Sequence, residues 1–169
     1  MAQLRAGKSD ALGSLFETHS AAVFGYFYRL TRPAGIADDL TQEVFLRVLR
    51  YHASFKPGNS FRVWLFGIAR NVLADHRARR IKQETEEAIE LDSLTMPSVQ
   101  FDRVASRETR ERVRAALDRL NDADRELLVL SRFHELKPAE LADLYDCKVG
   151  AIKVRIHRAL KRLATEIHR

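Results

Sequence analysis

The sequence predicts an all-α protein made of two small helical domains joined by a flexible acidic linker. Glycine and proline are scarce, at 7 and 4 of 169 residues, and apolar residues recur at helical spacing instead of alternating. Charge divides the chain into three parts: residues 1–80 carry 12 basic and 6 acidic side chains, residues 81–106 carry 2 and 6, and residues 107–169 carry 15 and 11. We therefore expect domains at 1–80 and 107–169, with the linker at 81–106.

The first block is expected to hold three to four helices, of which three have clear limits. Ser9 is a suitable N-cap for a helix that ends near Leu30, before a proline and a glycine. A second helix is predicted over about 36–51, and a third, capped by Ser60, over about 61–80. The side chains predicted to face inward from the second helix are Leu40, Val44, Phe45, Val48 and Leu49.

The second block ends in a helix–turn–helix pattern. Asn121 is a cap candidate for a helix that passes through Phe133, and Pro138 suits the first position of a short helix that reaches Tyr145. After a tight turn, residues 148–165 form a long helical pattern with one apolar stripe and six charged residues, all of them basic. A basic helix placed after a short helix and a turn is typical of the recognition helix that enters the DNA major groove.

We expect the first turns of this basic helix to meet base edges and its later turns to meet phosphates. The side chains assigned to DNA are Lys148, Lys153, Val154, Arg155, Arg158, Lys161 and Arg162. Lys153, Val154 and Arg155 are placed near bases, and the others near the DNA backbone. The alternative is a solvated basic face on an ordinary core helix.

Aromatic and basic residues are interleaved in a loop at 52–60 and in the helix that follows it. Exposed aromatic rings beside lysine and arginine are how many proteins hold unstacked bases, so this segment is a second candidate for DNA. Phe61 and Trp64 lie on the apolar stripe and are predicted to belong to the core. Phe55 lies in the polar loop and fits either a loop anchor or a base contact.

The second helix presents a polar outer face. Its residues are Asp38, Asp39, Gln42, Glu43 and Arg47. A solvated surface and a protein-docking face both explain it. No histidine, cysteine or further acid joins the carboxylates at ligand spacing, so we expect neither a metal site nor catalytic chemistry there.

Several classes of protein are disfavoured by composition. The single cysteine, Cys147, excludes an internal disulfide, and no cofactor-binding motif is found, so we expect no cofactor and no enzyme activity. No apolar run approaches the ~20 residues that span a bilayer, and the N-terminus lacks the apolar core of a signal peptide. A net charge of +6 favours nucleic acid as a partner. A cytoplasmic protein without membrane insertion is expected.

Three segments, in this order, resemble parts of a bacterial RNA polymerase sigma factor of the extracytoplasmic-function (ECF) group. Residues 38–45 (DDLTQEVF) are similar to that family's polymerase-binding helix, and residues 61–71 (FRVWLFGIARN) to its next helix. Residues 147–160 are similar to its upstream-element recognition helix. The resemblance covers essentially the whole chain and implies a sigma2-like first domain and a sigma4-like second domain.

The resemblance also implies a role for each face. Core RNA polymerase would bind Asp38, Asp39, Gln42 and Glu43. The −10 promoter element would be read and melted by Phe55, Lys56, Asn59, Arg70, Asn71, Arg77 and Arg80. The basic helix would bind the −35 element, and the linker would thread through the polymerase toward the RNA exit path.

The partners implied are core RNA polymerase, double-stranded and melted promoter DNA, and a separate anti-sigma factor. The function expected is that of an alternative sigma factor, which directs polymerase to promoters and starts transcription. The alternative is a stand-alone helix-turn-helix regulator whose N-terminal helices sense a signal or dimerise. That regulator would bind duplex DNA tightly without polymerase.

Overall fold

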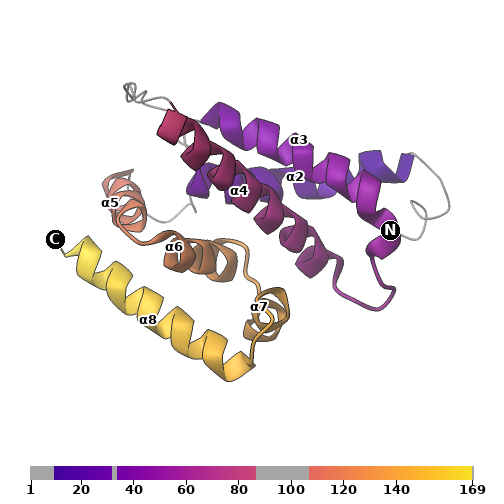
Figure 1. Ribbon diagram of the computed structural model, residues 1–169. Helices are drawn as coiled ribbons and strands as arrows, with labels where there is room; N and C mark the ends of the chain where they lie inside the picture. Colours follow the sequence, from indigo (N-terminus) through magenta and orange to yellow (C-terminus); the bar gives the residue numbers. More distant parts are fainter. Residues whose placement is uncertain (1–9, 32–33, 87–106, 169) are drawn as a thin grey trace. The chain divides into compact units, whose positions relative to one another are not determined.

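The computed structural model describes residues 10–31, 34–86 and 107–168 (Figure 1). Within these ranges the chain is mostly helical and contains no strand, which confirms the all-α prediction. The chain divides into two compact units, Met1–Thr95 and Met96–Arg169. Most of the predicted linker, residues 87–106, lies outside the described residues.

The first unit contains three long helices, α2 (Asp10–Leu30), α3 (Ala34–Tyr51) and α4 (Phe61–Glu86), with a short 3₁₀ turn, η1 (His52–Ser54), after α3. α3 packs against both α2 and α4, whereas α2 and α4 contact each other far less. Figure 1 shows α3 and α4 lying side by side. α3 is therefore the central helix of this unit, and it contacts α4 directly.

Aromatic rings make up much of the core of the first unit. Tyr26 and Phe27 are fully buried, and the ring of Tyr26 packs edge-on against Phe66 of α4 with 5.7 Å between centroids. Nearer the start of α2, Phe16 meets Phe45 of α3 at 4.9 Å. Full burial of a ring such as Phe27 or Phe66 contributes about 1.5–3 kcal/mol, whereas Phe16 is 42% exposed and contributes less. The buried rings therefore hold the three helices together.

Two helix predictions for this unit need correction. Leu49 was predicted to face inward but is 45% exposed, because Val48 beside it fills the buried stripe at this turn. The third helix was predicted to end near Arg80 but continues to Glu86. Its extra residues, 81–86, include good helix formers and no proline or glycine, so nothing in the sequence stops it there.

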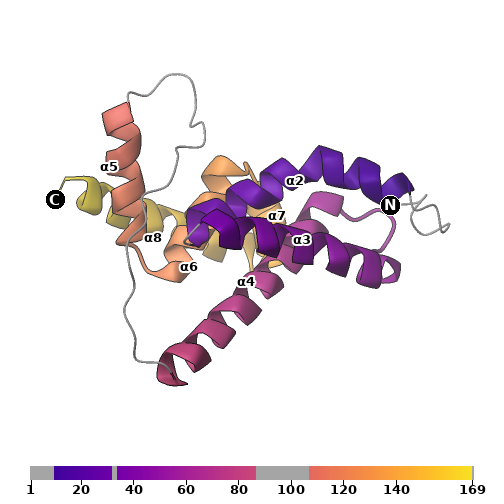
Figure 2. The same cartoon turned by 90° about the horizontal axis from the view of Figure 1, so that it is seen from above.

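The second unit consists of α5 (Arg107–Asp118), α6 (Asp122–Leu128), the π-helical turn η2 (Val129–Phe133), α7 (Pro138–Leu144) and α8 (Val149–Ile167). α8 contacts α5, α6 and α7, so it is the element that these shorter helices share. Figure 2 shows α8 from above, with its C-terminal part near α5. Its core includes Leu117, Leu120, Leu128 and Ala159, with Leu160 and Leu163 packed against them.

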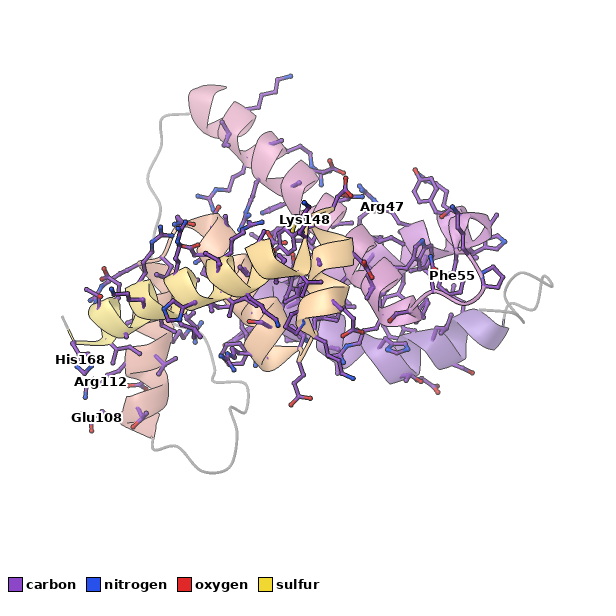
Figure 3. All side chains as sticks on the ribbon, turned by 90° about the horizontal axis from the view of Figure 1, so that it is seen from below. Arg47, Phe55, Glu108, Arg112, Lys148 and His168 are labelled. Atoms are coloured by element: carbon purple, nitrogen blue, oxygen red, sulfur yellow. The ribbon has the colours of Figure 1, made fainter. Side chains whose placement is uncertain are left out.

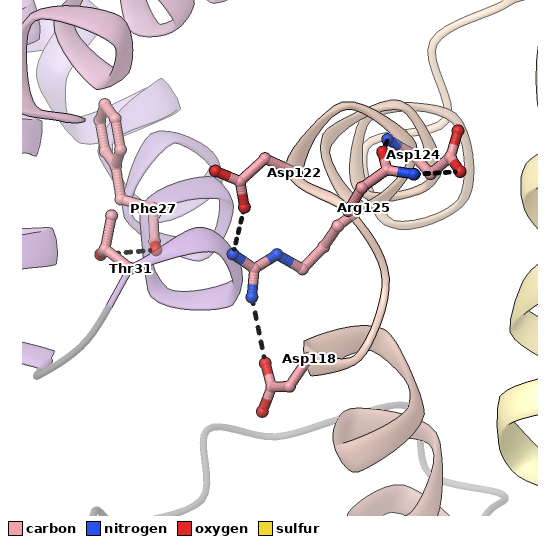
Figure 4. Close-up of polar contacts among 7 residues, drawn as sticks. Phe27, Thr31, Asp118, Asp122, Asp124 and Arg125 are labelled. Atoms are coloured by element: carbon pink, nitrogen blue, oxygen red, sulfur yellow. Dashed lines mark hydrogen bonds and ion pairs between the residues drawn. The ribbon is translucent and has the colours of Figure 1, made fainter. Parts of the chain in front are cut away.

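Polar groups define the helix starts in the second unit. The side chain of Asn121 accepts a hydrogen bond of 2.9 Å from the Asp124 N–H, which confirms the predicted cap of α6. Arg125 forms ion pairs with Asp122 at 3.0 Å and with Asp118 at 3.3 Å, and so links α6 to the end of α5 (Figure 4). At the start of α7 the Lys137 N–H donates to the Glu140 carboxylate at 2.8 Å, so a glutamate caps a helix that lacks a hydroxyl cap.

The helix predicted to run from Asn121 through Phe133 is not uniformly α-helical. Its last part is the π-helical turn, in which the His134 N–H reaches the Val129 carbonyl at 3.2 Å. Glu135 then adopts a positive φ of 49° and turns the chain toward α7. None of the helices in the described ranges is long and apolar enough to cross a membrane.

Candidate nucleic-acid and protein interfaces

The turn between α7 and α8 fixes where the basic helix begins. Asp146 has a positive φ of 47°, and the Cys147 N–H donates to the Ala142 carbonyl at 3.0 Å, which closes the end of α7. Lys148 is extended, with φ −70° and ψ 142°, and its carbonyl accepts the first helical bond from Ile152 at 3.2 Å. α8 therefore starts at Val149 as a new helix after a short turn, which is the helix-turn-helix arrangement.

α8 presents a cationic face to solvent. Ile152 and Ala159 are fully buried on its inner side. The predicted DNA-contacting residues that lie exposed on the outer side are Lys148, Lys153, Val154, Arg158 and Lys161. Val154 is 49% exposed among these charged side chains. These five residues form one continuous surface, which we call the α8 face.

Arg155 lies differently from its neighbours. It is half-buried, and its guanidinium lies 5.0 Å from the centre of the Tyr145 ring at the end of α7. A cation over an aromatic face is attracted to it, so this contact ties α8 to α7. The side chain that was expected near bases is thus held at the edge of the α8 face.

Arg162 also has a partner within its own unit. Its guanidinium donates to the carboxylate of Asp124, which is the residue held by the Asn121 cap. The Arg162 side chain is 56% exposed, whereas Asp124 is 14% exposed. The structure therefore uses Arg162 to join the last turns of α8 to the start of α6.

Beside the α8 face, α7 and α8 border an open groove of about 320 Å³. Its lining combines apolar and cationic side chains: Ser131, Arg132, Leu136, Pro138, Lys153, Ile156, His157 and Leu160. His157 was not among the predicted contacts, yet it is exposed one turn after Lys153. Its spacing of four residues from Lys153 was the signal that could have placed it on this face.

The loop before α4 is anchored by an aromatic cluster. Phe55 is 8% exposed and packs edge-on against Trp64 at 5.5 Å and Phe61 at 6.0 Å (Figure 3). The ring of His19 approaches Phe61 at 5.1 Å, and burial, followed by the nearby charge of Arg62, lowers the pKa of that histidine. Of the two interpretations left open for Phe55, its burial favours the loop anchor.

The rest of the loop lies above this cluster. Lys56 and Asn59 are exposed, and the Asn59 N–H donates to the Lys56 carbonyl at 3.2 Å across a tight turn. Gly58, with a φ of 92°, supplies the left-handed conformation that the turn needs. Ser60 accepts a long hydrogen bond of 3.4 Å from the Val63 N–H, as expected for the cap of α4. The side chains of Lys56 and Asn59 are thus exposed on a turn that the aromatic cluster anchors.

The remaining predicted −10 contacts are spread along α4. Asn71 and Arg80 are exposed, whereas Arg70 and Arg77 are half-buried. In the same part of the helix, burial lowers the pKa of His76, and the charges of Arg79, Arg80 and Arg77 lower it further. Burial is thus the main cause of the lowered pKa of His76, and the three arginines add to it because like charges disfavour the imidazolium.

On α3 the predicted protein-docking residues do lie on one surface. Asp38, Asp39 and Gln42 are exposed, and Glu43 is half-exposed one turn further on. We call these four residues the α3 face. Arg47 binds Glu43 at 2.7 Å and also Asp75 of α4 at 2.7 Å, which raises the pKa of the arginine above its ordinary value.

Asp75 was not singled out from the sequence, because it carries no periodic signal of its own. Within the described ranges, histidine, cysteine, aspartate and glutamate side chains form no group of three or more that could hold a metal ion.

Comparison with known protein families identifies both units. Residues 15–82 match Sigma-70 region 2, and residues 110–163 match Sigma-70 region 4. The chain belongs to the sigma-70 family of RNA polymerase sigma factors. The two matches cover the helices that carry the α3 face, the loop before α4 and the α8 face.

Relatives place it in the ECF group of sigma factors. It is 35% identical over 162 residues to the ECF RNA polymerase sigma factor BldN of Streptomyces coelicolor, covering 95% of this chain but 61% of BldN. It is 30% identical over 163 residues to the RNA polymerase sigma factor CarQ of Myxococcus xanthus, covering 96% of this chain and 92% of CarQ. The chain thus spans less than two thirds of one relative and nearly all of the other.

Solved structures of sigma factors share its fold. RpoE of Bartonella quintana, in complex with the anti-sigma factor NepR, superposes with a TM-score of 0.78 at 22% identity, covering 92% of this chain and 96% of RpoE. CnrH, in complex with the cytosolic domain of CnrY, gives a TM-score of 0.72 at 26% identity, covering 97% of this chain and 92% of CnrH. A CnrH of Cupriavidus metallidurans is also among its relatives in sequence.

Proposed function

We propose that this sigma factor binds core RNA polymerase through the α3 face and directs it to promoters with two separate DNA-binding surfaces. The observation that carries the proposal is the pairing of both sigma regions with a cationic surface in each unit. A stand-alone regulator would use its first unit to sense a signal or to dimerise, and would not need a sigma region there. The family membership of the first unit therefore favours a sigma factor over that alternative.

In this proposal the α8 face lies in the major groove of the −35 element. Lys153 and Val154, in the second turn of α8, would reach base edges, while Lys148, Arg158 and Lys161 would meet phosphates. Arg155 and Arg162 are already engaged with Tyr145 and Asp124, so their share in DNA binding would come with a change of partner.

The −10 element is assigned to the loop before α4 and to α4 itself. Lys56 and Asn59 are offered by the turn, and the buried Phe55 would hold that turn in place. Asn71, Arg77 and Arg80 extend the surface along the helix, with Arg70 as a further candidate. Exposed polar side chains on a turn that is anchored by aromatic residues are suited to binding a DNA strand once it leaves the duplex.

The proposed partners are core RNA polymerase, promoter DNA and an anti-sigma factor. CnrH, at 26% identity, was solved with the cytosolic domain of CnrY, which supports a protein partner other than polymerase for this chain as well. The proposed site of action is the cytoplasm, where polymerase and DNA are found. The chain's contribution is recognition, and the polymerase supplies the chemistry of RNA synthesis.

Gel filtration of the purified protein with bacterial core RNA polymerase tests the proposal. Wild-type protein should elute with the polymerase. Asp39→Ala combined with Glu43→Ala should weaken the complex and keep the helical circular-dichroism spectrum, because both side chains reach the surface. Glu17→Ala, an acid on the exposed side of α2, is the matched control and should elute like wild type.

Two results would count against it. Absence of a complex, with duplex DNA binding retained, would return the chain to the class of stand-alone regulators. A normal complex formed by the double variant would remove polymerase binding from the α3 face.

A further inference from the structure

Arg47 lies between the two functional surfaces of the first unit. It starts from α3, one turn after Glu43, and its guanidinium reaches across to Asp75 on α4 (labelled in Figure 3). The bond to Glu43 uses Nε, and the bond to Asp75 uses Nη1, so two different nitrogens serve the two helices. Both distances are 2.7 Å, as expected for charge-assisted hydrogen bonds.

Exposure differs among the three side chains of this link. Arg47 is 22% exposed, whereas Glu43 is 37% and Asp75 is 54% exposed. The arginine is the shielded member, and the two carboxylates lie outside it with water on their free sides. Glu43 belongs to the α3 face, and Asp75 lies one turn after Asn71 on α4, the helix assigned to DNA.

We propose that Arg47 is a positioning residue that transmits polymerase docking at α3 to the DNA-binding helix α4. It holds the Glu43 carboxylate for the polymerase and fixes the turn of α4 around Asp75 relative to the docked helix. The inference rests on the proposed function, because it assigns polymerase to one end of the link and DNA to the other.

The chemistry of arginine suits this role. Its planar guanidinium offers N–H donors at fixed angles, so it can hold one carboxylate on each helix in a single geometry. A lysine has the same charge but is a compact, freely rotating donor, and it would not hold both carboxylates at these angles. Arg47→Lys therefore separates the geometry of the link from its charge.

Promoter opening by pre-assembled holoenzyme tests the proposal. The probe is a promoter fragment selected from a genomic library by transcription with wild-type holoenzyme, labelled with a fluorescent base in its −10 region. Core polymerase is present at a saturating concentration, so that weaker binding of a variant to polymerase does not affect the measured opening rate. Circular dichroism sets an assay temperature at which every variant is folded.

Arg47→Ala, Arg47→Lys and Asp75→Asn should each slow opening by about fivefold, the factor that a well-formed exposed ion pair can supply. Combining Arg47→Ala with Asp75→Asn should slow it no further, because both changes break the same link. Arg50→Ala removes an exposed arginine from the same helix and is the matched control, expected to open the promoter at the wild-type rate.

The outcomes separate this inference from the proposed function. Opening rates within about twofold of wild type for Arg47→Ala and Asp75→Asn would overturn the inference and leave the proposed function intact. Additive effects of the two substitutions would also overturn it. A wild-type protein that neither joins polymerase nor opens any promoter would overturn the proposed function itself.

Discussion

Phe55 supports a tight turn without being offered to solvent itself. Its ring packs against Trp64 and Phe61, so the loop that carries the exposed Lys56 and Asn59 is anchored by a buried aromatic side chain. The sequence left its role open, because a phenylalanine in a polar loop can be an anchor or a contact. Burial, which depends on α4 folding back beside the loop, could not be read from the loop alone.

Phe55→Ala should therefore act on stability first. The substitution removes a buried ring and leaves a cavity, so the free energy of unfolding should fall by about 3 kcal/mol. Chemical denaturation followed by circular dichroism measures it. Lys56→Ala, at the next and exposed position, should change stability by less than about 0.5 kcal/mol. Equal small effects of both changes would show that Phe55 is not an anchor.

Lys153 and Arg158 are one and a half turns apart on the α8 face and are assigned different tasks. Lys153→Ala should alter the preferred −35 sequence, because a base contact is lost. Arg158→Ala should weaken binding evenly across sequences and reduce the slope of log affinity against log salt by about 1. Binding of holoenzyme to a panel of −35 variants at several salt concentrations measures both. Identical profiles for the two variants would contradict the division of tasks.

At the scale of helices, two of the predicted caps lie in the described residues and are confirmed, whereas Ser9 lies outside them. Asn121 and Ser60 cap α6 and α4 as predicted, because a cap depends only on residues a few positions away. The end of α4 and the π-helical turn after α6 were not predicted. No proline or glycine marks either place.

Asn121→Ala should destabilise the second unit. The change removes the acceptor for the Asp124 N–H and should lower the free energy of unfolding by about 1 kcal/mol. Asn121→Asp keeps the acceptor and should restore most of the loss. Denaturation of the full-length protein, monitored by hydrogen exchange of amides in α6 and α8, measures the effect within this unit. An Asn121→Asp protein as unstable as Asn121→Ala would show that the hydrogen bond is not the cause.

At the scale of the whole molecule, the division of the chain was visible in its charge and in the order of its motifs. The fold class and the family followed from these patterns, because both are properties of long stretches of sequence. The pairing of Arg47 with Asp75 and the partners of Arg155 and Arg162 did not follow, since each joins two different helical segments. Basic residues that look alike in sequence thus differ in the partners that they hold within the folded protein.

Stability should depend on pH through two histidines of the first unit. Burial is the main reason that the pKa values of His19 and His76 lie below 6.5, so the folded state binds fewer protons than the unfolded state. Their contribution is constant above that pH, and stability is lost as the pH falls below it. Thermal unfolding at about pH 7.5 and about pH 5.5 should show a lower Tm in acid.

Replacing both histidines by asparagine should reduce that difference in Tm. The asparagine side chain does not titrate in this range, so the linkage to pH is removed. A difference in Tm that is unchanged in the double variant would assign the acid sensitivity to other groups.

The bond between Arg162 and Asp124 has a consequence for the entropy of DNA binding. A lysine or arginine that meets a phosphate releases a cation condensed on the DNA, and that release drives binding. While Arg162 stays paired with Asp124, it neutralises no phosphate and so releases no condensed cation. The net number of ions released on binding is therefore smaller than the number of basic side chains on α8. Part of the positive charge of that helix stabilises the second unit itself.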